Sequence, residues 1–310
     1  MSIVAVAGGT GKLGRAVVDG IVADGKFEVV VLAREADDAK SKEIGARIVA
    51  VDYTNPDAIT SVLEQNRIAI VISTLSSQCP PERELNLIKG AARSSTTTRY
   101  IPSVWGVPGT EDIASYFPIA AINLRFLKAL EATTLEWTAV YNGYFLDYFG
   151  APKVKTYMPP LAIFVDLANK FAAIPASGDV PVVFTHTFDV GKFVAALLTK
   201  DKWEKESYII GDKITINEFI RIAESFSGTR FTIEHDSIDR LKTGQITELP
   251  CHPMFYPFFP KEILQGMFAG IGVMCETGVF DLTPSHTLNE EFRSIRPKSV
   301  KELVSEFYGA

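Results

Sequence analysis

The sequence is poor in cysteine and in clustered basic charge, and each shortage excludes a class of protein. Its three cysteines, Cys79, Cys251 and Cys275, lie far apart without a C-x-x-C pair, so we expect a reducing compartment, no disulfide framework and no metal site. The net charge is −6, and no basic stripe or arginine cluster is present to neutralise phosphates. A nucleic-acid partner is therefore not expected.

Long apolar runs are missing as well. The longest stretches, such as Met267 to Met274, are too short and too rich in glycine to span a bilayer, which argues against a membrane partner. Because an apolar strand begins directly after Met1, we expect no signal or transit peptide. With an ordinary 47% hydrophobic and 22% charged residues, the sequence predicts a cytoplasmic globular protein.

The most informative segment is the glycine-rich stretch near the start of the chain. Apolar residues 2–7 are typical of a strand, and residues 15–22 repeat apolar side chains at helical spacing. The loop between them fits G-x-G-x-x-G from Gly9 and G-x-x-G-x-x-G from Gly8. Strand, glycine loop and helix together indicate a dinucleotide site rather than an ordinary turn, since backbone without Cβ atoms lets a pyrophosphate approach the helix start. The predicted cofactor-binding residues here are Gly8, Thr10, Gly11, Lys12, Leu13 and Gly14.

The first half of the chain alternates strand-like and helix-like segments. The expected strands after the first are Phe27–Leu32, Arg47–Val51, Ile68–Ser73, Arg99–Pro102 and Trp137–Tyr141, and the expected helices between them are Pro56–Gln65, Glu82–Ala92 and Ser115–Ala132. Apolar strands separated by helices imply a parallel sheet covered on both faces. We therefore predict an α/β fold of the Rossmann type, a doubly wound parallel sheet, over residues 1–150.

The second half has a looser pattern. Asp189–Leu198 is helix-like, and capping boxes open helices at Thr215 and Ser299. We expect residues 151–310 to form a smaller, mostly helical C-terminal substrate lobe, with residues 185–212 returning to the Rossmann core.

The end of the second strand indicates which dinucleotide is bound. Arg34 follows that strand, where a basic residue accepts the 2′-phosphate of NADP and an acidic one binds the ribose of NAD. Because a guanidinium pairs with phosphate in a bidentate manner, Arg34 favours NADP(H), and Lys40 could add positive charge. Glu35 is the counter-evidence, since a shift of one residue would place a carboxylate at the ribose.

Other strand ends should also contact the cofactor. Hydroxyls and backbone after the fourth strand can bind sugar oxygens, although serine and threonine also start turns without any ligand. The residues expected to contact the cofactor after the fourth, fifth and sixth strands are Thr74, Leu75, Ser76, Ser103, Val104 and Asn142.

Three segments carry a resemblance to a known family. Residues 100–106 (YIPSVWG), 137–145 (WTAVYNGYF) and 185–191 (THTFDVG) join the glycine loop and Arg34 in this pattern. The chain resembles the NmrA-like and isoflavone reductase-like family of atypical short-chain dehydrogenases, clearly to about residue 200 and more weakly beyond. The resemblance implies a Rossmann domain that binds NADP(H), a C-terminal substrate lobe and, often, reduction of an aromatic or terpenoid natural product.

The chain departs from the resemblance at the catalytic position. Tyr116 is followed four residues later by Ala120, so the Tyr-x-x-x-Lys pair of common short-chain dehydrogenases is absent. Enzymes resembling isoflavone reductase carry a lysine on the helix before the sixth strand, and Asn123 takes that place here, whereas Lys128 lies five residues on and faces elsewhere. Asn123 can donate a hydrogen bond but cannot serve as a general acid near neutral pH.

Several polar residues are candidates for holding a substrate oxygen. The predicted catalytic residues are Asn123, Ser103, Tyr116, Tyr141, Tyr144 and His252. His252 lies in the proline-stiffened aromatic segment 250–260, which suits the wall of a hydrophobic pocket but also a buried structural loop. An enzyme requires an apolar cavity lined by Trp105, Tyr144 and this segment.

Three functions remain open from the sequence. The first is an NADPH-dependent reductase of a small apolar, cyclic substrate. The second is a non-catalytic regulator that senses NADP(H) and passes its redox state to a protein, and the third is a redox-neutral isomerase or cyclase that retains the cofactor. The absent lysine favours the second and third, whereas the aromatic segment favours the first and third. A hydrophobic small molecule is the expected partner, and a homodimer is left open.

Overall fold

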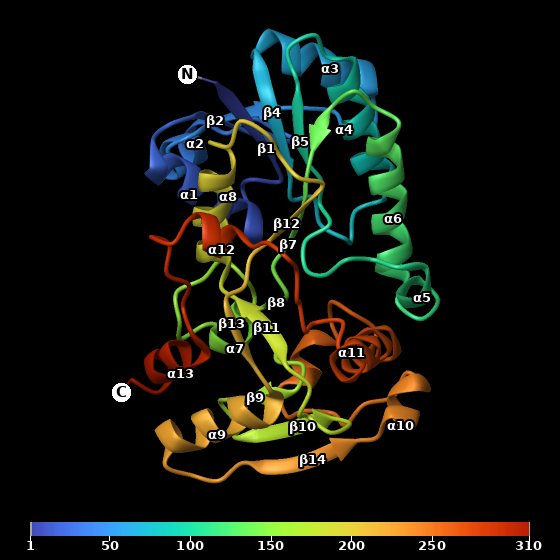
Figure 1. The fold of residues 1–310 in the computed structure, drawn as a ribbon, viewed down its shortest axis with the longest axis vertical. Coiled ribbons are helices and arrows are strands. Elements are labelled where there is room, and N and C mark those ends of the chain that lie inside the picture. Colours follow the sequence, from blue (N-terminus) through green and yellow to red (C-terminus); the bar gives the residue numbers. More distant parts are fainter. Residues whose placement is uncertain (1, 310) are drawn as a thin grey trace.

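The computed structural model describes residues 2–309, which form two lobes stacked along the long axis of the molecule (Figure 1). The upper lobe is built on a six-stranded parallel sheet in the order β3-β2-β1-β4-β5-β6. Its strands are β1 (Ile3–Ala7), β2 (Glu28–Ala33), β3 (Arg47–Ala50), β4 (Ile68–Ser73), β5 (Arg99–Ile101) and β6 (Glu136–Trp137). This order confirms the predicted Rossmann-type fold, in which a crevice opens where the order reverses between β1 and β4.

Helices cover both faces of the sheet because alternate strand residues point to opposite sides. Val4 and Val6 of β1 belong to one core, and Ala5 and Ala7 belong to the other. The first core is covered by α1 (Lys12–Asp24), α2 (Asp38–Ile44) and α8 (Thr187–Leu197), and the second by α3 (Pro56–Gln65), α4 (Glu82–Arg93) and α6 (Pro118–Glu131). The apolar strands predicted from the sequence are therefore buried from both sides.

Helices α1 and α8 cross at glycine. A Cβ atom on Gly191 would lie 2.2 Å from the carbonyl oxygen of Ala16, and one on Gly20 would lie 2.5 Å from the carbonyl carbon of Gly191. The helix backbones therefore touch directly. This contact ties a helix from the second half of the chain to the helix that follows the glycine loop.

A second element from the latter half also joins the upper lobe. The strand run that contains β6 is interrupted at Thr138 and continues as β7 (Ala139–Tyr141), and β12 (Glu206–Tyr208) pairs with β7 in parallel. Helix α8 and strand β12 come from the second half of the chain but lie against elements of the first half. The predicted domain boundary at residue 150 therefore stays a prediction.

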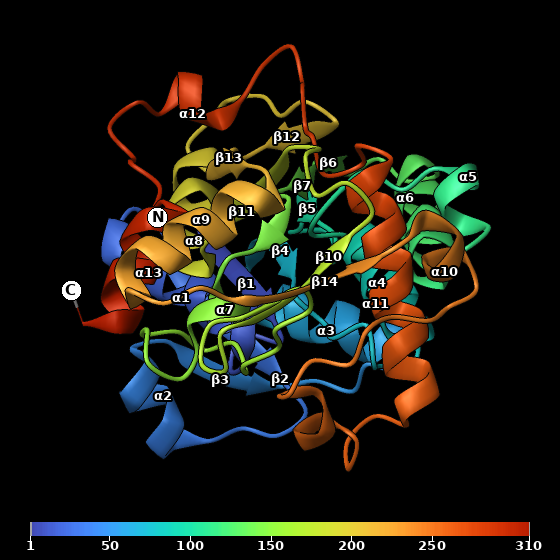
Figure 2. The same ribbon diagram turned by 90° about the horizontal axis from the view of Figure 1, so that it is seen from below.

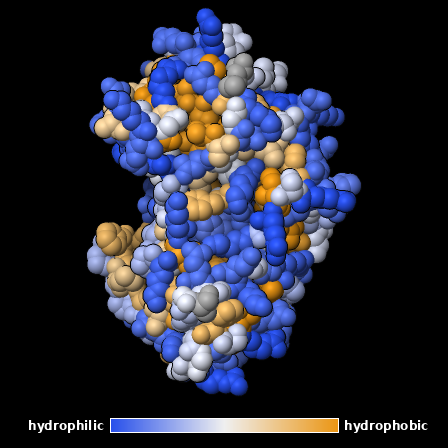
Figure 3. Space-filling model, turned by 90° about the vertical axis from the view of Figure 1, so that its left-hand side faces the viewer, coloured by the Kyte–Doolittle hydropathy of each residue, from blue (hydrophilic) through white to orange (hydrophobic). Residues whose placement is uncertain are grey.

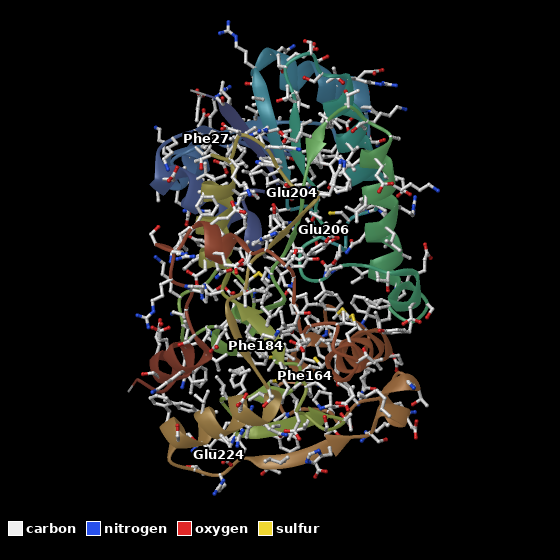
Figure 4. All side chains as sticks on the ribbon, in the orientation of Figure 1. Phe27, Phe164, Phe184, Glu204, Glu206 and Glu224 are labelled. Atoms are coloured by element: carbon white, nitrogen blue, oxygen red, sulfur yellow. The ribbon has the colours of Figure 1, made fainter. Side chains whose placement is uncertain are left out.

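The lower lobe contains more strand than the sequence indicated. One sheet joins β8 (Tyr144–Phe145), β11 (Val182–Thr185) and β13 (Asp212–Ile214), and another joins β9 (Val165–Asp166), β10 (Phe171–Pro175) and β14 (Thr232–Asp236). Its helices are α7 (Asp147–Gly150), α9 (Ile216–Ser227), α10 (Ile238–Lys242), α11 (Lys261–Glu276) and α13 (Val300–Tyr308). Helix α12 (Leu288–Glu291) instead packs against α8, and its Leu288 belongs to the core of the upper lobe. Seen from below, α9 and α13 lie on one side and α10 and α11 on the other (Figure 2). The core between them contains Phe164 and Phe184 (Figure 4).

Helix boundaries follow local signals. The capping boxes predicted at Thr215 and Ser299 both form. The helix expected over Ser115–Ala132 instead begins at Pro118 as α6, and a separate short helix, α5 (Glu111–Ala114), precedes it. Pro118 suits the first turn of a helix and restricts the residue before it. Within residues 2–309, no helix has the length and apolar character needed to cross a membrane.

Candidate cofactor and active site

The glycine loop is closed by contacts that leave no room for side chains. A Cβ atom on Gly14 would lie 2.3 Å from the carbonyl oxygen of Gly8, and Gly8 itself has a φ of +77°. Gly11 differs, because it is the N-cap of α1 without a side-chain cap and a Cβ there would meet nothing within 4 Å. The start of α1 therefore adjoins open space at the positive end of its dipole, an arrangement that suits a phosphate.

The loop residues between these glycines have different surroundings. Thr10 is half-buried, and Lys12 is exposed with a φ of +42°. Leu13 packs into the core beneath α1, so only its backbone faces the loop. Of these three predicted residues, Thr10 and Lys12 have side chains that can reach a ligand at Gly11.

Thr74, the first residue after β4, is hydrogen-bonded to the end of β1. Its backbone amide and its hydroxyl both donate to the carbonyl oxygen of Ala7, at 2.9 and 2.7 Å. Leu75 is half-buried, and Ser76 is exposed. The predicted residues after β4 therefore lie directly beside the glycine loop.

A surface pocket of about 460 Å³ lies at the ends of β2 and β3. It contains Arg34, as the sequence predicted, but Lys40 does not line it. The full lining is Arg34, Ala50, Val51, Asp52, Tyr53, Thr54, Ala58, Val62 and Arg83. Sequence reasoning missed all of these except Arg34, although Val51 ends a predicted strand and Asp52 follows it, and that position was a usable signal.

Hydrogen bonds join the loop after β5 to the neighbouring strand ends. The Ser103 hydroxyl donates to the carbonyl oxygen of Leu75 at 2.8 Å, and the Trp105 indole donates to that of Ser73 at 3.0 Å. Asn142 is fully buried, and its side-chain oxygen accepts from the Gly106 amide at 3.2 Å. Asn142 therefore holds the loop, and because its backbone amide also donates to the carbonyl oxygen of Gly106 at 3.0 Å, its contact with a cofactor stays a prediction.

A buried carboxyl, which the sequence did not reveal, organises the same strand ends. Glu84 of α4 is 3% exposed, and it accepts hydrogen bonds from the Tyr100 hydroxyl at 2.9 Å and the Ser103 amide at 3.3 Å. The Ser73 hydroxyl also contacts it. Burial raises the pKa of Glu84, and these hydrogen bonds oppose the rise. Because Glu84 lies in a charged run, Glu82 to Glu84, its sequence context suggests a solvated helix face.

Asn123 lies on α6 between the cores of the two lobes. Ala120, one turn earlier, belongs to the core of the lower lobe, and Phe126, one turn later, belongs to the core of the sheet. The Asn123 side chain is half-buried and has no hydrogen-bond partner among residues 2–309. Lys128 is exposed. Because it lacks a partner among these residues, the Asn123 amide is free to bind a ligand where the lobes meet.

The three candidate tyrosines do not converge equally. Tyr141 packs on the Tyr208 ring at 5.4 Å, and burial raises its pKa. Tyr116 is half-buried and packs against the lower-lobe core. Tyr144 is 8% exposed within that core, and its hydroxyl has no hydrogen-bond partner among the described residues. Burial raises the pKa of Tyr144 well above its ordinary value, so this hydroxyl remains a neutral donor.

His252 has a structural role. The ring is 1% exposed, Nδ1 accepts from the Leu249 amide at 3.2 Å, and Nε2 lies 2.9 Å from the carbonyl oxygen of Ala162. Both ring nitrogens are thus occupied by backbone, and burial lowers the pKa of His252. The interpretation of this segment as a buried structural loop fits His252 better than a catalytic role.

Neither the pocket at Arg34 nor a second surface pocket beside α13 is lined by Trp105, Tyr144 or the segment 250–260. Trp105 packs with the core under α1 and α8, whereas Tyr144 belongs to the lower-lobe core. In the segment 250–260, Phe258 is 79% and Met254 56% exposed. Trp105 and Tyr144 thus pack in separate cores, and a single cavity lined by both and by this segment stays a prediction. The space-filling view shows a notch in the outline between the lobes (Figure 3).

The geometry defines a Rossmann-type dinucleotide-binding protein with a second lobe beside the cofactor edge. The model of the NmrA-like family matches residues 1–302, and the chain belongs to that family. Oxidoreductase BOA1 of Botryotinia fuckeliana is 34% identical over 309 residues, covering 98% of this chain and 99% of the relative. Oxidoreductase swnN of Metarhizium robertsii is 30% identical over 276 residues, 81% of each chain.

The fold is also similar to solved structures. AtPrR2 in complex with NADP+ and (+)-pinoresinol has a TM-score of 0.76 at 20% identity, covering 99% of this chain and 98% of that one. This likeness confirms the fold over the full length.

Proposed function

We propose that this protein is an NADPH-dependent reductase of a small, apolar, natural-product-like molecule. The observation that carries the proposal is the open, uncapped start of α1 at Gly11, next to a pocket that contains Arg34. Relatives named oxidoreductases, and a structural neighbour that holds NADP+ and pinoresinol, support the reaction and substrate class.

The residues at the sheet edge suit the parts of NADP(H). The pyrophosphate would lie at Gly11, and the 2′-phosphate would pair with Arg34. Ala58 and Val62 give the pocket an apolar wall for the adenine base. Bound NADPH would supply a hydride to the substrate. The residues of the chain have to hold the NADPH, orient the substrate and stabilise the negative charge that develops on the substrate oxygen.

The substrate side would use hydrogen bonds rather than an ionisable acid. The Asn123 amide can donate to a carbonyl or ether oxygen, and this bond strengthens as negative charge develops on that oxygen. The buried Tyr144 hydroxyl lacks a partner among the described residues, and an oxygen of a bound molecule would satisfy it. Tyr116 would be a third donor. The proton that completes reduction would then come from water.

A redox-neutral isomerase or cyclase is the second candidate, and Asn123 favours it. An amide cannot deliver a proton, so a reaction that needs only orientation and oxyanion stabilisation suits this residue better. The regulator hypothesis also gains support, because Tyr144 packs in a core while Met254 and Phe258 are exposed. An exposed apolar group of this kind suits a protein partner.

Isotope transfer distinguishes these functions. The protein is incubated with NADPH deuterated at the transferable nicotinamide position and with a panel of apolar aryl ketones, enones, benzylic ethers and quinones. A reductase incorporates one deuterium per product and oxidises one NADPH for each. Product without deuterium, at constant NADPH, would establish the redox-neutral reaction. Tight NADPH binding without any product would favour the regulator.

A further inference from the structure

The pocket that contains Arg34 includes a second guanidinium. Arg83, near the start of α4, lines the same pocket. We propose that Arg83 is a specificity-determining residue, which together with Arg34 binds the 2′-phosphate of NADP(H). This inference rests on the proposed cofactor. Arg83, rather than Lys40, is then the second cation at the 2′-phosphate.

Neither arginine is neutralised by the protein. Among residues 2–309, Arg34 makes no hydrogen bond or ion pair, and the polar contact of Arg83 is a long one of 3.8 Å to the Cys79 sulfur. Asp52, the one carboxylate in the lining, accepts from the Thr54 amide and hydroxyl at 2.8 and 2.7 Å. These bonds lower the pKa of Asp52 and keep it ionised, so the lining carries two guanidiniums against one carboxylate. The excess of positive charge favours a bound phosphate dianion.

The two side chains come from separate elements. Arg34 follows β2 and is exposed, whereas Arg83 belongs to α4 and is half-buried. Since both line one pocket, a phosphate group there can be gripped by both, each through the bidentate geometry that guanidinium and phosphate share. Lys40 is on α2, outside this lining, and its backbone amide donates to the side chain of Asp37, which caps that helix.

The test uses two nucleotides that lack nicotinamide and differ only by the phosphate in question. Adenosine 2′,5′-bisphosphate and adenosine 5′-monophosphate are titrated calorimetrically into the full-length wild type, Arg34→Ala, Arg83→Gln and Lys40→Gln. Lys89→Gln is the matched control, since Lys89 is an exposed cation on the same helix. Arg83→Gln should weaken the bisphosphate about tenfold or more and leave the monophosphate nearly unchanged. Lys40→Gln and Lys89→Gln should alter neither probe appreciably.

Two outcomes overturn the inference while the proposed cofactor survives. In one, the wild type prefers the bisphosphate, Arg34→Ala abolishes this preference, and Arg83→Gln retains it. In the other, Arg83→Gln weakens both probes equally, which would place Arg83 against the adenosine. If the wild type itself does not distinguish the two probes, the assignment of NADP(H) fails instead. Thermal unfolding of each variant verifies that the protein is folded.

Discussion

The Tyr100 hydroxyl donates a 2.9 Å hydrogen bond to Oε1 of Glu84, which joins β5 to α4 inside the upper lobe. The same oxygen accepts from the Ser103 amide, and the Ser73 hydroxyl contacts the other oxygen. No cation contributes to the shifted pKa of this carboxyl. One buried acid therefore holds together the ends of β4 and β5 and the loop after β5 that carries Ser103.

Glu84→Ala should destabilise the protein by about 3 kcal/mol, because it leaves buried donors without an acceptor. Glu84→Gln keeps the oxygen that accepts from Tyr100 and Ser103 but places an NH2 donor at Ser73, whose hydroxyl must turn to accept, so this variant should cost less than Glu84→Ala. Burial raises the folded-state pKa of Glu84 above the ordinary 4.5, so its favourable contribution is present below pH 4.5 and is lost as the pH rises through the folded value. In urea unfolding at a series of pH values, the free energy of unfolding of Glu84→Gln should thus rise relative to that of the wild type from pH 4.5 upward. A difference independent of pH would contradict this account of the buried acid.

Gly11→Val should strongly weaken cofactor binding without loss of fold. The position has φ −134° and ψ 154°, an extended conformation that valine adopts, and a Cβ there meets no protein atom within 4 Å. We expect NADPH affinity to fall by about tenfold or more, with unfolding free energy within about 0.5 kcal/mol of wild type. Gly14→Ala is the contrasting variant, since its Cβ would lie 2.3 Å from the Gly8 oxygen and should cost about 2 kcal/mol. Normal NADPH affinity in folded Gly11→Val would mean that the phosphate loop lies elsewhere.

His252→Ala should reduce stability by about 3 kcal/mol and leave NADPH affinity unchanged, because the ring binds two backbone groups. Burial lowers its folded-state pKa below the ordinary 6.5, so its contribution is present above pH 6.5 and is lost as the pH falls through the folded value. The stability gap between wild type and variant should therefore narrow below pH 6.5. A stable variant that has lost turnover would instead return His252 to the active site.

Asn123→Lys should preserve turnover or raise it by up to about 100-fold if the protein is a reductase, because lysine can hold the ribose and relay a proton. Lys128→Gln provides the control on the exposed face of the same helix and should have no effect. Steady-state turnover and NADPH affinity are measured together. If turnover disappears while NADPH still binds, the asparagine has a role of its own and the redox-neutral reaction gains weight.

The sequence predicts those features whose signals are local. The strand–glycine loop–helix unit at residues 2–22, the apolar strands and the boxes at Thr215 and Ser299 all depend on near neighbours in the chain. A third box, Thr287 with Glu290, carried the same signal and was overlooked.

Features that depend on distant partners could not be predicted in the same way. Glu84 is buried because Ser73, Tyr100 and Ser103 supply its hydrogen bonds, and Arg83 joins Arg34 only through the packing of α4. Tyr144 and Trp105 are both aromatic near strand ends, and only the stacking of layers assigns them to separate cores.

The cofactor of this protein is NADP(H), and paired calorimetric titrations with NADPH and NADH test this assignment most directly. The wild type should bind NADPH at least about tenfold more tightly than NADH, because charge-assisted bonds to the 2′-phosphate are available only to NADPH. Arg34→Ala should bring the two affinities close together by weakening NADPH alone. Equal affinities in the wild type, or no binding of either nucleotide, would contradict the account.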